Sequence, residues 1–248
     1  MEYLTDLLAD VEERIDHIRT IGDINDDLVS IAVNNLYSVK ADLVATGRNG
    51  QIINKVNRQI NMYDKISLIP EVKKKLPIIY EQMIVLMVGA LEVYIADIFR
   101  GISNKNPEYL VWKIEKEKIS FEPILLAEGF TLGDVIIGHL KSQGFSFQDL
   151  RSTLSAFEKY FDIRIELDDV VREKLILAAA CRNVIVHNRS TIDGGFQKQV
   201  RATSFYDDKN YKKGGKLKID DTYTNQLGET IKEFCRNITV LLMHRNDG

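Results

Sequence analysis

Residues 77–102 form an apolar segment that repeats with the period of an α-helix and is apolar on almost every side. It opens near Pro77, a residue that the first turn of a helix tolerates. Its longest apolar run, Met83 to Leu91, is about half of the ~18 residues that indicate a membrane span. We therefore expect a central helix that other helices cover, and no contact with a membrane.

Most of the remaining chain also carries apolar residues at helical spacing. The pattern predicts two helices over residues 1–46 with a break at Gly22, a weaker helix over 52–63, short helices over 109–118, 132–142 and 148–160, and long helices that begin at Asp169 and Tyr223. Short alternating segments at 200–206 and 216–219 flank turn residues and predict a β-hairpin. We expect an all-α fold with an N-terminal helical extension over residues 1–65 and a helical domain over 66–248, which carries the hairpin at about 198–220.

Composition and charge narrow the class of protein. The 248 residues are 45% hydrophobic and 28% charged, which is typical of a soluble globular protein. The net charge of −3 gives no overall attraction to nucleic acid, so such binding requires a local basic patch. Cys181 and Cys235 lack a CxxC or Cys/His cluster and are interpreted as buried thiols. Together with an acidic, amphipathic start that differs from a signal peptide, they favour a cytoplasmic location.

The helix that begins at Asp169 changes from apolar to polar toward its end. Apolar residues repeat from Val171 to Ala178, and Arg182 takes the next place, where the pattern predicts an apolar residue. The neighbouring stripe ends in Asn183 and His187. One interpretation is structural: the arginine pairs with a core carboxylate, and the histidine caps the helix end. The other interpretation is a functional site.

Residues 182–187 read Arg-Asn-Val-Ile-Val-His, which has the form R-N-x-x-x-H, and here the chain resembles the HEPN superfamily (higher eukaryotes and prokaryotes nucleotide-binding domains). In the ribonuclease members the motif lies late in the last long helix of a helical bundle, and a short polar stretch follows it. Residues 187–193 are similar to that stretch. The segment LMVGALEVYIADIF at 86–99 is similar to the central family helix, whose acidic residue corresponds to Glu92. The resemblance covers roughly residues 73–195 and implies a HEPN-like bundle.

This resemblance implies a metal-independent endoribonuclease that acts on RNA at the interface of a homodimer. Arg182 would hold the phosphate, and His187 would transfer protons. Asn183 would orient one of these two side chains. Glu92 would support Arg182 by pairing with it, or would pair instead with an unrelated lysine. Arg182 and His187 lie about 140° apart on an ideal helix, so a two-fold partner is expected to complete the site. No metal or cofactor is expected.

The resemblance also implies a toxin or antiphage effector with an antitoxin or other defence-system protein as its partner. Toxins that a nucleotidyltransferase neutralises look like R-x-x-x-x-H-x-Y, and Arg189 stands here in place of the modified tyrosine. That route of neutralisation is therefore in doubt. Two alternatives stay open: a non-catalytic HEPN-like module that binds RNA or a nucleotide or that dimerises, and a helical scaffold with a purely structural arginine.

Five lysines lie between residues 209 and 218, close to Tyr206 and Tyr211. Lys212, Lys213 and Lys216 are candidates for contacts with RNA phosphates, and the tyrosines for stacking on bases. The alternative is an exposed hairpin edge that lysines protect from aggregation.

Overall fold

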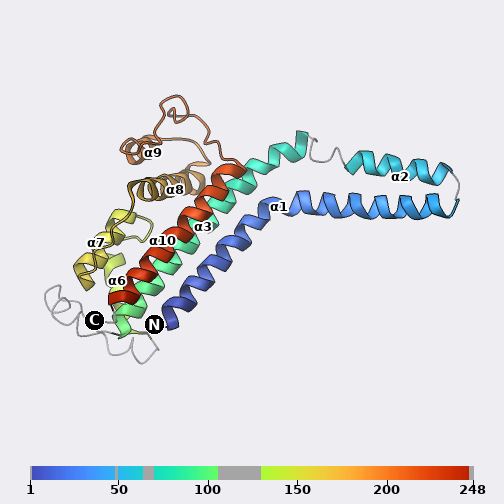
Figure 1. The fold of residues 1–248 in the computed structure, drawn as a ribbon. Coiled ribbons are helices and arrows are strands. Elements are labelled where there is room, and N and C mark those ends of the chain that lie inside the picture. The colour runs from blue at the N-terminus through green and yellow to red at the C-terminus, as the bar shows by residue number, and fades with distance from the viewer. Residues whose placement is uncertain (1, 48–49, 64–69, 106–129, 246–248) are drawn as a thin grey trace.

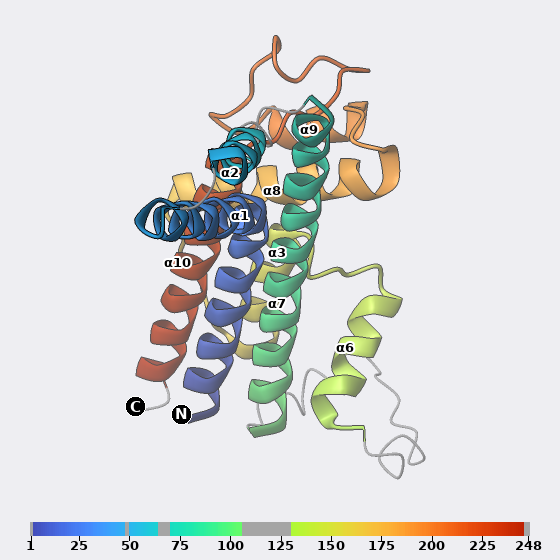
Figure 2. The ribbon, with the colours of Figure 1, turned by 90° about the vertical axis from the view of Figure 1, so that its right-hand side faces the viewer.

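The computed structural model describes residues 2–47, 50–63, 70–105 and 130–245 (Figures 1 and 2). Its elements are α1 (Glu2–Ala45), α2 (Gly50–Tyr63), α3 (Pro70–Lys105), α6 (Leu132–Ser142), α7 (Leu150–Phe161), α8 (Asp169–Asn188), α9 (Gly194–Val200) and α10 (Asp221–Arg245). Within these ranges there is no β-strand, and the all-α prediction is confirmed. The helix predicted over 109–118 lies outside the described residues.

The body of the molecule is built on α3, α10 and the first half of α1, which run side by side (Figure 2). Helix α8 packs across α3 and α10, and α6 packs against α3. The part of α1 after residue 30 lies alongside α2, and together they form a helical arm that projects from the body (Figure 1). Side chains at the start of α1, such as Leu4 and Ile15, share one core with α3 and α10. The core therefore crosses the predicted boundary at residue 65.

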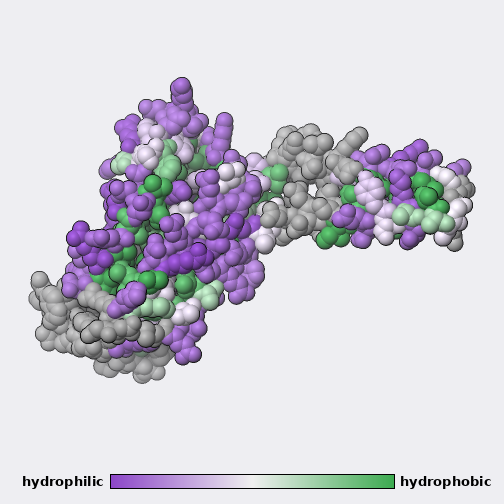
Figure 3. Space-filling model, viewed as in Figure 1, coloured by the Kyte–Doolittle hydropathy of each residue, from purple (hydrophilic) through white to green (hydrophobic). Residues whose placement is uncertain are grey.

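The helical arm leaves several apolar side chains exposed. Helix α2 buries Val56 and Ile60, whereas Ile31, Tyr37 and Val44 of α1 are exposed. The surface view shows apolar side chains among the polar ones on this arm (Figure 3).

Two predicted helix boundaries are wrong. Helix α1 continues through Gly22, where a Cβ would lie 3.5 Å from Tyr80 and 3.6 Å from Met83. A helical glycine costs only about 1 kcal/mol, which tertiary packing offsets. Helix α3 starts at Pro70 and continues through Pro77, although an interior proline removes one backbone donor and crowds the preceding turn, at a cost of about 3 kcal/mol.

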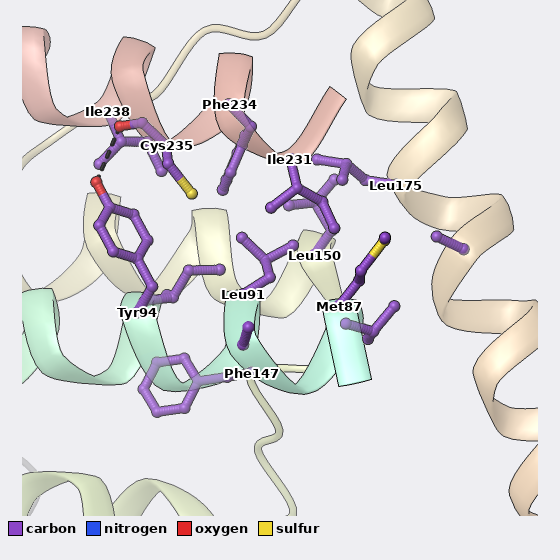
Figure 4. Packing of buried hydrophobic residues seen from close by; sticks show 14 of the residues in the cluster. Met87, Leu91, Tyr94, Phe147, Leu150, Leu175, Ile231, Phe234, Cys235 and Ile238 are labelled. Carbon is purple, nitrogen blue, oxygen red and sulfur yellow. Dashed lines mark hydrogen bonds between the residues drawn. The ribbon is translucent and has the colours of Figure 1, made fainter. Parts of the chain in front are cut away.

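Helix α3 is the central helix, as its pattern predicts. Met87 and Leu91 of α3 meet Leu175 of α8 and Ile231 and Phe234 of α10 in a continuous apolar core (Figure 4). Among the described helices, the segment Leu76–Lys105 is long and apolar enough to cross a membrane, but 56% of its apolar window is buried inside the protein.

Both cysteines are buried and free. Burial raises the pKa of the Cys181 thiol to about 12, and the Tyr223 hydroxyl donates to its sulfur at 3.8 Å. The Tyr94 hydroxyl donates to the Cys235 carbonyl at 2.9 Å (Figure 4). Neither thiol is therefore placed for nucleophilic chemistry.

The β-hairpin predicted at about 198–220 is not present. Asp193 instead caps α9, with its carboxylate accepting from the Phe196 amide at 2.8 Å. A series of turns follows, and then residues 214–217 pair with the chain after α8. The Leu217 amide donates to the Ser190 carbonyl at 2.8 Å, and an isolated bridge joins Thr191 to Lys216. The prediction failed because residues 190–192 pair with residues 214–217, and no pairing with the segment 200–206 occurs there.

Candidate functional site

The R-N-x-x-x-H motif lies in the last two turns of α8. The helix begins at the N-cap Asp168, whose carboxylate accepts from the Val170 amide at 2.8 Å. Its apolar face is buried, and the side chains of Cys181 and Val184 continue that face through the motif. The helix is thus anchored in the core while its polar face turns outward.

The three motif side chains meet on this polar face. Arg182 Nη1 donates to Asn183 Oδ1 at 3.3 Å and lies 3.5 Å from His187 Nε2. Arg182 and Asn183 are half-buried, and His187 is exposed. The two side chains therefore reach each other from one helix. The angle of about 140° separates their Cα atoms, but a long arginine side chain crosses the helix surface and closes the gap.

Glu92 approaches this site from α3. Its Oε2 accepts from Gln148 Nε2 at 3.2 Å, while Oε1 is buried without a hydrogen-bond partner among the described residues. Burial raises the pKa of the Glu92 carboxyl, against the smaller opposing effects of the Gln148 hydrogen bond and the Arg182 charge. Glu92 thus lies within electrostatic range of Arg182, although the two form no direct ion pair.

Gln148 is a site residue that the sequence did not indicate. It lies in the turn before α7, 56 positions from Glu92 in the chain. Only the packing of α3 against the segment before α7 brings the two side chains together.

The end of α8 has an unusual backbone. Arg189 and Ser190 both have positive φ, at 50° and 58°, which non-glycine residues rarely adopt. The Ser190 amide closes the helix by donating to the Val184 carbonyl at 3.0 Å. The Lys216 ammonium donates to the Arg189 carbonyl at 2.5 Å and to Thr191 Oγ1 at 3.1 Å. Lys216 therefore holds the turn that follows the motif.

The other two candidate lysines behave differently. Lys212 and Lys213 are exposed and have no side-chain hydrogen bond to the part of the chain that the structure describes. Tyr211 is half-buried, and its ring packs on Phe196 with centroids 5.2 Å apart. Tyr206 is half-buried too, and its hydroxyl donates to Asp208 at 2.5 Å. The lysines thus remain free to contact phosphates, whereas both rings are partly enclosed.

This arrangement can bind and protonate a phosphate ester. It offers a guanidinium at an accessible helix end, with an amide and an imidazole each within hydrogen-bonding reach of it. Among the described residues there is no group of three or more His, Cys, Asp or Glu side chains that could hold a metal ion.

The comparisons with known proteins do not place the chain in a family. No family model matches it, and neither a curated protein nor a solved structure shows significant similarity to it.

Proposed function

We propose that this protein is an endoribonuclease of HEPN type that cleaves RNA without a metal ion. The observation that carries the proposal is the 3.5 Å approach of Arg182 Nη1 to His187 Nε2 at the accessible end of α8. A guanidinium beside an imidazole suits phosphodiester cleavage through the ribose hydroxyl, because the first can stabilise negative charge and the second can transfer a proton. Buried structural arginines, by contrast, pair with core carboxylates, and Arg182 has no such ion pair among the described residues.

The reaction follows from these groups. The 2′-hydroxyl loses its proton to an imidazole, and its oxygen attacks the adjacent phosphorus. The bond from phosphorus to the 5′-oxygen breaks, and that oxygen takes a proton as it leaves. The Arg182 guanidinium stabilises the charge that develops on the phosphoryl oxygens. The products are a 2′,3′-cyclic phosphate and a 5′-hydroxyl.

A second copy of the chain supplies what one copy lacks. The reaction uses a base and an acid, and each chain brings a single His187 to the motif. Val186, next to it, is 46% exposed and offers an apolar contact beside the site. We propose a homodimer in which the two α8 ends share one cleft. The specific activity should then fall on dilution together with the dimer fraction measured by mass photometry, and a fully active monomer would contradict the proposal.

Cleavage of single-stranded RNA in EDTA tests the proposed activity. Wild type should cut, whereas Arg182→Ala and His187→Ala should each lose cutting, because the first removes charge stabilisation and the second removes proton transfer. His244→Ala is the matched control, since His244 is an exposed histidine near the end of α10. Loss of wild-type activity in EDTA would exclude the metal-independent mechanism. RNA binding without any cutting would favour the non-catalytic binding module instead.

The cellular role is proposed from the resemblance to toxins and antiphage effectors. Expression of wild type should arrest growth and degrade RNA, whereas expression of His187→Ala should do neither. Equal growth of the two strains would contradict the toxin proposal, and the enzyme proposal would then rest on the cleavage assay alone.

A further inference from the structure

A cavity lies apart from the motif, between α8, α10 and the segment that follows α9. Its volume is about 170 Å³, smaller than a typical small-ligand site of about 300–1,000 Å³, so it can hold only one part of a larger ligand. Neither Arg182 nor His187 lines it. Its principal lining residues are Lys174, Leu177, Phe205, Tyr211, Tyr223 and Gln226.

The lining is suited to a flat ring. Tyr211, Tyr223 and Phe205 bring three aromatic side chains to one small space. The Tyr223 hydroxyl is engaged by Cys181, so this residue contributes its ring. Tyr211 is fixed by its contact with Phe196, and its carbonyl accepts from Gln197 Nε2 at 2.9 Å. Rings held in this way bind a planar ligand with little loss of conformational entropy.

The rim of the cavity is suited to a negative charge. Lys174 is half-buried and forms no ion pair with any residue that the structure describes. Its neighbour Glu173 is already engaged, since its carboxylate accepts from the Ser204 amide at 2.8 Å. Gln226 is exposed and offers an amide donor and acceptor. A ligand with a planar ring and an attached anion would match the lining and the rim.

The chain segment around the cavity adds further positive charge. Residues 201–220 contain six basic and three acidic side chains. Lys212 and Lys213, which follow Tyr211 directly, are exposed. A chain of phosphates can therefore lead away from the cavity along these lysines, as in proteins that combine basic grooves with aromatic stacking.

We propose that this cavity binds the base of one unpaired nucleotide in an RNA strand, with Lys174 on its phosphate and the neighbouring phosphates on Lys212 and Lys213. The assignment of the ligand to an RNA strand rests on the proposed ribonuclease function. The preference for a planar ring and an anion rests on the side chains of the cavity. The substrate is then single-stranded RNA, because a paired base cannot enter. A free nucleotide has the same chemistry, and the experiment separates the two sources.

Fluorescence anisotropy of a dye-labelled oligoadenylate tests this inference in the His187→Ala background, where the RNA stays uncut. Tyr211→Leu should weaken binding about ten-fold, or about 1.4 kcal/mol, because it removes one stacking surface. Lys174→Glu should weaken it as well, and less so at high salt. Tyr37→Leu is the matched control, since Tyr37 lies half-exposed on the helical arm. Thermal unfolding of each variant checks its fold, and Lys174→Glu tests the cavity even if Tyr211→Leu is unstable.

The outcomes are distinct. Tighter binding of the single strand than of its duplex with oligouridylate, lost in both cavity variants, supports the inference. Binding of adenosine monophosphate alone with the same sensitivity supports the cavity and identifies a free nucleotide as the source. Unchanged affinity in folded variants, or equal affinity for the duplex, overturns it. Cleavage by the wild type is measured in parallel. If the cavity variants bind RNA normally and the wild type cuts, only the cavity inference is overturned. If the cavity binds a nucleotide and the wild type does not cut, only the enzyme proposal is overturned.

Discussion

Lys216 should stabilise the end of α8, whereas the other lysines of its segment should not. We propose to compare Lys216→Met with Lys218→Met, since both changes remove one positive charge from an exposed position. Lys216 Nζ donates to the Arg189 carbonyl at 2.5 Å and to Thr191 Oγ1 at 3.1 Å. Lys218 makes no such contact with the described residues.

The magnitude follows from these two hydrogen bonds. A hydrogen bond from a charged group contributes about 1.5–3 kcal/mol when it is shielded from water. The Lys216 side chain is exposed, so solvent screening reduces this to about 1 kcal/mol for the pair of bonds. In a chain of this length, that loss lowers Tm by about 2–4 °C. Lys218→Met should leave Tm nearly unchanged.

Thermal unfolding followed by circular dichroism gives the global effect, and hydrogen exchange gives the local one. In Lys216→Met the Ser190 amide, which donates to the Val184 carbonyl, should exchange faster. The reason is that the turn with two positive φ angles loses the two hydrogen bonds from Lys216. Equal Tm values and equal exchange in the two variants would refute the structural role of Lys216. RNA affinity measured on the same samples shows whether Lys216 also contacts phosphate.

Two further predictions concern the core and the contact between α1 and α10. Phe234→Ala should lower the free energy of unfolding by about 3–5 kcal/mol, because Phe234 is fully buried; urea unfolding measures this, and Phe130→Ala, at a side chain 48% exposed, should change it little. Lys232 Nζ lies 2.8 Å from Asp16 and 3.1 Å from Glu229, and its hydrogen bonds lower the pKa of both carboxyls below their ordinary values of 3.8 and 4.5. The two carboxylates thus stabilise the folded state at a pH above their ordinary pKa values, and this contribution is lost as the pH falls through the lowered pKa values. On acidification, the wild type should therefore lose more stability than Lys232→Met. Free energies of unfolding in urea that fall in parallel with pH in the two proteins would contradict this.

Local signals in the sequence were sufficient to locate several of the helices. The apolar period located α6, α8 and α10, and Asp168 before an apolar run marks the start of α8 because its carboxylate can satisfy the free amides of the first turn. The same period shows that Arg182 interrupts an apolar stripe. These features depend only on neighbours within a few residues, which the sequence displays directly.

The tertiary structure decided what depends on distant partners. The pairing of residues 214–217 with 190–192, the hydrogen bond from Gln148 to Glu92, and the cavity beside Tyr211 all join segments far apart in the chain. No local pattern specifies such pairs, since each partner alone has the properties of an ordinary surface residue or turn. Gly22 shows the same limit. Its low helix propensity predicts a break, but α1 is continuous because its packing on α3 stabilises the helix by more than the glycine destabilises it.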